Sequence, residues 1–227
     1  MYFLLFIIAI IFAITAQAKV QSAFREASQQ PNRRGYTGAQ VAQQILMLSG
    51  INDVAVERVA GNLTDHYDPK HRVLRLSEGV YDSNSLAALG VAAHESGHAI
   101  QDDTGYAWLQ LRTAMVPIAS FASRLAMPLI LLGILFYGAG SRSFLMTDIG
   151  LVLFAVSVLF TLITLPVEFD ASKRAIAVLQ DNSFLSPDEI GPAKKVLDAA
   201  AMTYVASAAV ALVNFMRMAA IFGRRRG

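Results

Sequence analysis

The chain contains no cysteine and only four histidines among its 227 residues. The absence of cysteine excludes disulfide bonds and thiolate metal ligands, so a metal site would have to use histidine and carboxylate side chains. The net charge is only +2, and no basic stripe with interleaved aromatic residues occurs. We therefore expect no nucleic-acid partner.

Charged residues are also scarce, at 16% of the sequence, whereas hydrophobic residues make up 55%. Soluble domains contain roughly 45–50% apolar residues, so this composition favours a membrane protein. Several long segments carry no charged side chain at all. The composition predicts a mainly α integral membrane protein with three or four transmembrane helices and one water-facing domain.

The N-terminal segment 1–18 has no charged residue and is near the lower limit for a membrane span. Ala16-Gln17-Ala18 resembles a signal-peptidase site, so a cleaved signal peptide is the alternative. No positive residue precedes the apolar run, which favours an uncleaved anchor. Lys19 and Arg25 follow the segment, and the positive-inside rule places that side in the cytoplasm.

Residues 19–112 form the longest water-facing stretch, and the sequence predicts several of its elements. Thr37 can cap a helix that runs to about Leu48, with Gly50 as its stop. Two short strands are expected around Val54–Val56 and Val73–Leu76, joined by a polar link. Asp82 or Ser83 is expected to cap a second helix, which ends near Asp102-Asp103.

Segment 113–167 is predicted to form a transmembrane hairpin. Residues 125–141 and 149–167 are uncharged, and the connection between them contains Gly138 and Gly140. The positive-inside rule places this tip outside the cell. A buried helical pair is the alternative, and Pro128, which interrupts the first segment, keeps that reading open for it.

Polar sequence resumes in segment 168–198, where Glu168 is expected to open a new amphipathic helix after Pro166-Val167. Segment 199–227 combines an apolar helix with the basic tail Arg224-Arg225-Arg226. The apolar helix could cross the membrane, pack on the water-facing domain or lie in the interface. The sequence leaves these three arrangements open.

The most informative motif is His94-Glu95-Ser96-Gly97-His98. Two histidines four residues apart lie on one face of a helix, where both imidazoles can bind one metal ion. A glutamate directly after the first histidine can take a proton from the metal's water. The alternative is a pair of ordinary helix residues beside a surface glutamate.

A catalytic zinc usually has a third protein ligand. The candidates are His66, His71, Asp102, Asp103 and Glu168. The two histidines stand beside the predicted strands, and nothing directs the two aspartates toward a third tetrahedral position. Glu168 directly follows a membrane segment, where a charged residue is a functional candidate. An ordinary first-turn glutamate that interacts with the helix dipole is equally compatible.

Three separated segments carry a family resemblance. They are the string from Ala87 to Gln101 around the motif, Asp65-His66-Tyr67-Asp68-Pro69 before it, and Leu165-Pro166-Val167-Glu168-Phe169 after it. In this order they resemble the YugP-like family of bacterial membrane zinc metallopeptidases. More distantly, the chain is similar to the HtpX-type and CAAX-prenyl-type membrane proteases, which are gluzincins.

The resemblance implies a zincin-like catalytic domain with Zn²⁺ bound by His94, His98 and Glu168 and with Glu95 as the catalytic base. In the distant relatives, an aspartate four residues after the third ligand supports the site. This chain has Ser172 there, and the nearest aspartate is Asp170. The partner that supports the zinc ligands is therefore left open.

The expected activity is that of a membrane-bound zinc metalloendopeptidase acting on proteins or peptides close to the lipid bilayer. The resemblance and the positive-inside rule together place it in the bacterial inner membrane, with segments 19–112 and 168–198 on the cytoplasmic side. The Val73–Leu76 strand could bind an extended peptide by strand addition. The alternative function is a non-hydrolytic, metal-binding membrane scaffold or transporter. The sequence indicates no oligomeric state.

Overall fold

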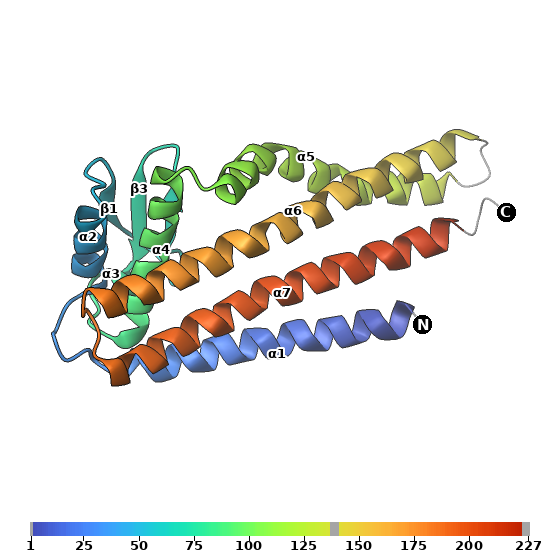
Figure 1. Ribbon diagram of the computed structural model, residues 1–227. Helices are drawn as coiled ribbons and strands as arrows, with labels where there is room; N and C mark the ends of the chain where they lie inside the picture. The colour runs from blue at the N-terminus through green and yellow to red at the C-terminus, as the bar shows by residue number, and fades with distance from the viewer. Residues whose placement is uncertain (1, 137–140, 224–227) are drawn as a thin grey trace. The chain divides into compact units, whose positions relative to one another are not determined.

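The computed structural model describes residues 2–136 and 141–223 (Figure 1). The predicted hairpin tip at Gly138 and Gly140 and the basic tail at Arg224–Arg226 lie outside these residues. The helices are α1 (Tyr2–Ser28), α2 (Gly38–Leu48), α3 (Glu78–Tyr81), α4 (Leu86–Asp103), α5 (Ala107–Leu135), α6 (Ser141–Asp181) and α7 (Pro187–Gly223); the strands are β1 (Ala55–Val59), β2 (His66–Asp68) and β3 (Val73–Ser77). The mainly α architecture with one small sheet confirms the predicted fold class.

The chain forms two compact units. The helical unit comprises Met1–Thr15, Gln110–Leu165 and Tyr204–Gly227, and the mixed unit comprises Ala16–Leu109 and Pro166–Thr203. The mixed unit contains the whole sheet and the motif helix α4. Each unit is described by itself below.

The sheet of the mixed unit has the strand order β1-β3-β2. Strand β3 is central; it pairs in parallel with β1 and antiparallel with β2. The sequence predicted β1 and β3 but assigned β2 to a polar link. Its three residues, His66, Tyr67 and Asp68, are too few and too polar to show the alternation that marks a strand.

Helix α4 contributes residues to both apolar clusters of the mixed unit. On one side, Ala88, Ala92 and Ala99 contact a cluster that includes Leu74 and Leu76 of β3. On the other, Leu89 and Ala93 contact side chains of α1, α6 and α7. Alanine and glycine dominate α4 because its neighbours approach closely on both sides.

Serine and threonine side chains fix where the helices of the mixed unit begin. Thr37 and Gln40 form a capping box at the start of α2, and Gly50 follows its end with φ 77°, as predicted. For α4 the predicted cap was wrong. Ser85, rather than Asp82 or Ser83, accepts the N–H of Ala88, because the short helix α3 occupies the preceding residues.

Glu168 does not open a new helix, because α6 continues without a break from Ser141 to Asp181. Pro166 lies inside it, and Pro117 and Pro128 lie inside α5. A proline removes one backbone hydrogen bond, but neighbouring helices can maintain a membrane helix around it. Glu168 therefore lies on the same helix as the apolar segment that precedes it.

The helical unit consists of long apolar helices that approach one another closely. Among the residues that the structure describes, four helices, each of which also extends into the mixed unit, are long and apolar enough to cross a membrane: Tyr2–Ser28, Ala107–Leu135, Leu145–Asp181 and Pro187–Phe222. Gly150 of α6 faces α5, and a Cβ there would lie 2.9 Å from the Ala126 carbonyl oxygen. Such small-residue contacts are typical of helix packing in membranes. The fourth segment contains the C-terminal helix whose arrangement the sequence left open.

Candidate functional site

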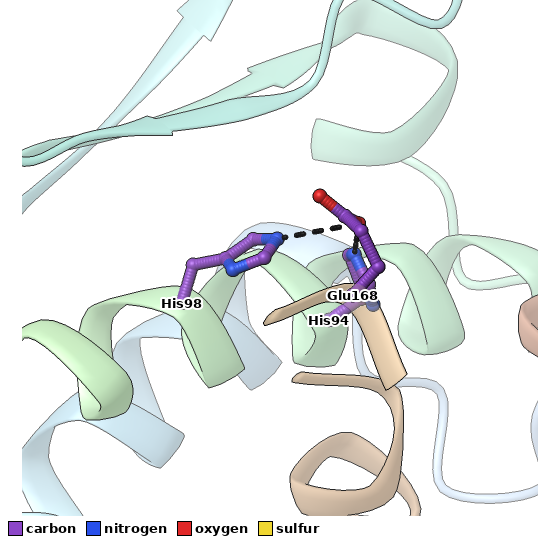
Figure 2. Close-up of side chains that lie close together, drawn as sticks. All are labelled: His94, His98 and Glu168. Atoms are coloured by element: carbon purple, nitrogen blue, oxygen red, sulfur yellow. Dashed lines mark hydrogen bonds and ion pairs between the residues drawn. The ribbon is translucent and has the colours of Figure 1, made fainter. Parts of the chain in front are cut away.

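His94 and His98 lie one turn apart on α4, and the carboxylate of Glu168 on α6 lies close to a nitrogen of each imidazole ring (Figure 2). Glu168 Oε2 is 3.3 Å from His94 Nε2 and 3.7 Å from His98 Nε2. The metal-ligating atoms of the three side chains all lie within 4.8 Å of one another. Of the five third-ligand candidates from the sequence, Glu168 is the one that joins the two histidines.

The chemistry of this cluster fits a zinc ion. Two imidazole nitrogens and one carboxylate oxygen are the ligand types of a catalytic zinc site that keeps one position open. Glu168 is only 2% exposed and His98 7% exposed, whereas the His94 side chain is 14% exposed. A buried carboxylate needs a compensating partner, and two histidines or a cation supply one.

Electrostatics acts on His98 in two opposite directions. Burial disfavours the charged imidazolium and lowers the pKa of His98, but the Glu168 carboxylate and the charge of Glu95 raise it, and the net pKa lies above its ordinary value. A raised pKa favours a proton on the His98 imidazole, and a metal ion bound by this histidine would have to displace that proton.

Glu95 is held by the edge strand of the sheet. The backbone N–H of Tyr67 on β2 donates to Glu95 Oε2 at 3.1 Å. This bond fixes a carboxylate next to the histidine pair and leaves its other oxygen, Oε1, for a proton. The Glu95 carboxylate also lies close enough to His98 for its charge to raise the pKa of that histidine.

Each histidine is supported from behind by a neutral polar side chain. Ser172 Oγ lies 3.2 Å from His94 Nδ1, and Gln101 Oε1 lies 3.0 Å from His98 Nδ1. Asp170 does not contact a histidine; it accepts a hydrogen bond from Gln101 at 2.8 Å. The residue that orients His94 is therefore Ser172, and the residue that orients His98 is Gln101.

Asp102 belongs to a separate polar network. It accepts hydrogen bonds from the Tyr67 hydroxyl at 2.7 Å and from Arg72 at 3.0 Å. Partial burial and the neighbouring Asp102 carboxylate raise the pKa of Tyr67, so its phenol stays protonated. Arg72 also pairs with Asp53 at 2.6 Å and lies 3.8 Å from Asp103. Asp102 connects α4 to β2 through Tyr67, and none of the three aspartates belongs to the histidine cluster.

His66 on β2 and His71 before β3 are exposed, and neither belongs to the cluster of His94, His98 and Glu168. His66 Nδ1 is 2.7 Å from the Thr64 carbonyl oxygen, and His71 Nδ1 is 2.6 Å from Asp68. The hydrogen bond from His71 lowers the pKa of Asp68 to about 2. The structure does not bring either histidine to the site.

Two residues of the site escaped the sequence reasoning. Gly97, inside the motif, lets α4 approach α6: a Cβ there would lie 2.7 Å from the Ala171 carbonyl oxygen. Gln101, three residues after His98, is completely buried. Its i, i+3 spacing from His98 was a usable signal, because side chains at that spacing are neighbours on a helix.

Comparison with known proteins gives consistent results over almost the whole chain. The family described as "Putative neutral zinc metallopeptidase" matches residues 2–223. The chain is 45% identical over 222 residues to a Bacillus subtilis (strain 168) protein named "Putative membrane protease YugP", and the match covers 98% of this chain and 96% of that protein. No solved structure matches the chain.

Proposed function

Because the chain belongs to the neutral zinc metallopeptidase family, we propose that it is a membrane-bound zinc endopeptidase of the gluzincin type. His94, His98 and Glu168 are the proposed zinc ligands, and Glu95 is the proposed general base. The observation that carries this proposal is the convergence of three ligand atoms from α4 and α6 within 4.8 Å, beside an oriented glutamate.

Bound zinc would act as a Lewis acid on the scissile carbonyl and lower the pKa of a water molecule. Glu95 accepts the proton of the attacking water through the oxygen that Tyr67 does not occupy, and then delivers it to the leaving amine. His94 and His98 hold their Nδ1 atoms toward Ser172 and Gln101. Their Nε2 atoms therefore remain available on the side of Glu168.

An extended substrate requires a free strand edge next to the site. The predicted Val73–Leu76 strand cannot offer one, because β3 pairs with strands on both sides. Strand β2 is at the edge of the sheet, and its Tyr67 N–H already faces Glu95. We place the substrate backbone along β2, where strand addition would align a peptide carbonyl with the site.

The proposed substrates are proteins or peptides close to the membrane surface. Glu168 directly follows the uncharged segment 149–167 on the same uninterrupted helix, so the proposed site lies near the end of that segment. Lys19, Arg25, Lys173 and Arg174 flank the apolar segments on this side. The positive-inside rule then gives a cytoplasmic orientation for the site, in a bacterial inner membrane.

Replacing Glu95 with Gln tests the reaction directly. The amide keeps the size of the side chain but cannot accept the water's proton, so we expect peptide hydrolysis to fall by about 10²–10⁴-fold. Zinc content should stay at the wild-type level. The measurement is zinc stoichiometry together with hydrolysis of a peptide library by the purified protein in detergent.

Glu57→Gln is the matched control, because Glu57 is an exposed β1 residue paired with Arg75. It should leave both zinc content and hydrolysis unchanged. Full hydrolysis by Glu95→Gln would exclude Glu95 as the base. Zinc binding by a wild-type protein that cleaves nothing would instead favour the metal-binding scaffold or transporter.

A further inference from the structure

Gln101 is a polar side chain without any exposed surface, one turn beyond His98 on α4. Its carbonyl oxygen and its NH₂ group both have hydrogen-bond partners. Oε1 is 3.0 Å from His98 Nδ1, and Nε2 donates to the Val167 carbonyl oxygen and to Asp170 Oδ2, each at 2.8 Å. A buried amide satisfied in this way is a strong and directional constraint on its neighbours.

The partners of Gln101 determine which way its amide faces. A backbone carbonyl and a carboxylate both accept hydrogen bonds, so they require the NH₂ group. The carbonyl oxygen of Gln101 must then face His98, and this oxygen can only accept. His98 Nδ1 therefore carries the proton, and Nε2 is the nitrogen directed toward Glu168 (Figure 2).

The same amide reaches the turn of α6 that carries Glu168. Val167 precedes Glu168 directly, and Asp170 follows it by two residues. Asp170 is itself held by Arg174 at 2.6 Å, and the Arg174 guanidinium lies over the Tyr106 ring. One side chain thus contacts a proposed ligand on α4 and both flanks of the proposed ligand on α6.

We propose that Gln101 is a positioning residue for the metal site: it selects the His98 tautomer and sets the separation of His98 from Glu168. The proposal rests on the ligand set of the proposed function but not on peptide hydrolysis. Loss of the amide should weaken zinc binding by about 10–100-fold, the usual effect of removing a partner that orients a ligand.

The first test uses the wild-type protein. Long-range ¹⁵N–¹H spectra of the metal-free protein, recorded above the titration range of its four histidines, should show His98 with its proton on Nδ1. A proton on Nε2 would overturn the proposal whatever the variants do. A change to mixed tautomers in Gln101→Met would support it, because a purely structural role would leave the tautomer unchanged.

The second test is zinc affinity, measured by competition with a chelator. Gln101→Glu replaces the NH₂ donor by an oxygen that faces two acceptors, and Gln101→Met removes both polar groups at similar volume. Gln43→Glu is the control, because Gln43 is exposed on α2. Affinities of both Gln101 variants within twofold of wild type would overturn the proposal.

The two proposals fail in different ways. If wild type binds zinc, the Gln101 variants bind it weakly and no form cleaves peptides, the positioning role stands and the peptidase function falls. If wild type cleaves peptides and the Gln101 variants keep both zinc and activity, the peptidase function stands and the positioning role of Gln101 falls. Circular dichroism of each variant shows whether the helices are retained.

Discussion

Glu168 is the proposed zinc ligand with the least exposed side chain, so little solvent is available to replace a lost partner. We expect Glu168→Gln to reduce zinc affinity by about 100-fold or more, since the neutral amide cannot supply a charged ligand oxygen. Zinc affinity measured by chelator competition checks this. A variant that binds one zinc per chain as tightly as wild type would show that another group is the third ligand.

Glu189→Gln is an informative control for Glu168→Gln. Glu189 is also a buried carboxylate, but it accepts hydrogen bonds from the Arg33 N–H and from Ser186 at the start of α7. Its replacement should lower the free energy of unfolding by about 1 kcal/mol, as the loss of a helix cap does. Zinc affinity should not change.

Among single residues, the histidine pair could be predicted from the sequence, but the side chains that hydrogen-bond to the two histidines could not. Histidines at i and i+4 face one way on any helix, so their pairing follows from local geometry alone. Ser172 of α6 contacts His94, and Gln101 of α4 bonds both to His98 and to α6, because the two helices pack against each other. Packing between segments about seventy residues apart leaves no local pattern in the sequence. Pro166 was misleading as well, because α6 continues through it without a break.

At the scale of elements, the approach of α4 to α6 at Gly97 sets the geometry of the site. We expect Gly97→Ala to destabilise the protein by about 1–3 kcal/mol and to weaken zinc binding, because the new methyl group would push against the Ala171 carbonyl group. Thermal unfolding and chelator competition measure the two effects.

Gly90→Ala is the matched control on the same helix. A Cβ at Gly90 would meet Ala193 at 3.6 Å, an ordinary contact distance, and alanine favours a helix over glycine by about 1 kcal/mol. This variant should be as stable as wild type or more stable. Equal effects of the two substitutions would show that the α4–α6 spacing is not the cause.

For the molecule as a whole, the absence of cysteine makes its orientation in the membrane easy to measure. A membrane-impermeant maleimide applied to intact cells should label Gly138→Cys, in the tip that the sequence places outside, but not Gln43→Cys on α2. In permeabilised cells the maleimide should label both variants. Wild type supplies a background without any thiol. Labelling of Gln43→Cys in intact cells would reverse the proposed orientation.

Helix α6 has a mechanical consequence for the whole protein. It runs without a break from Ser141 to Asp181 and carries both an apolar segment and the buried carboxylate of Glu168. Moving Glu168 along the helix axis by a single residue would displace it by about 1.5 Å relative to the two imidazoles. A bilayer that is too thin or too thick exerts such a force on a helix. Metal retention should therefore report on the lipid surroundings, and extraction into a short-chain detergent should release zinc before it unfolds the protein.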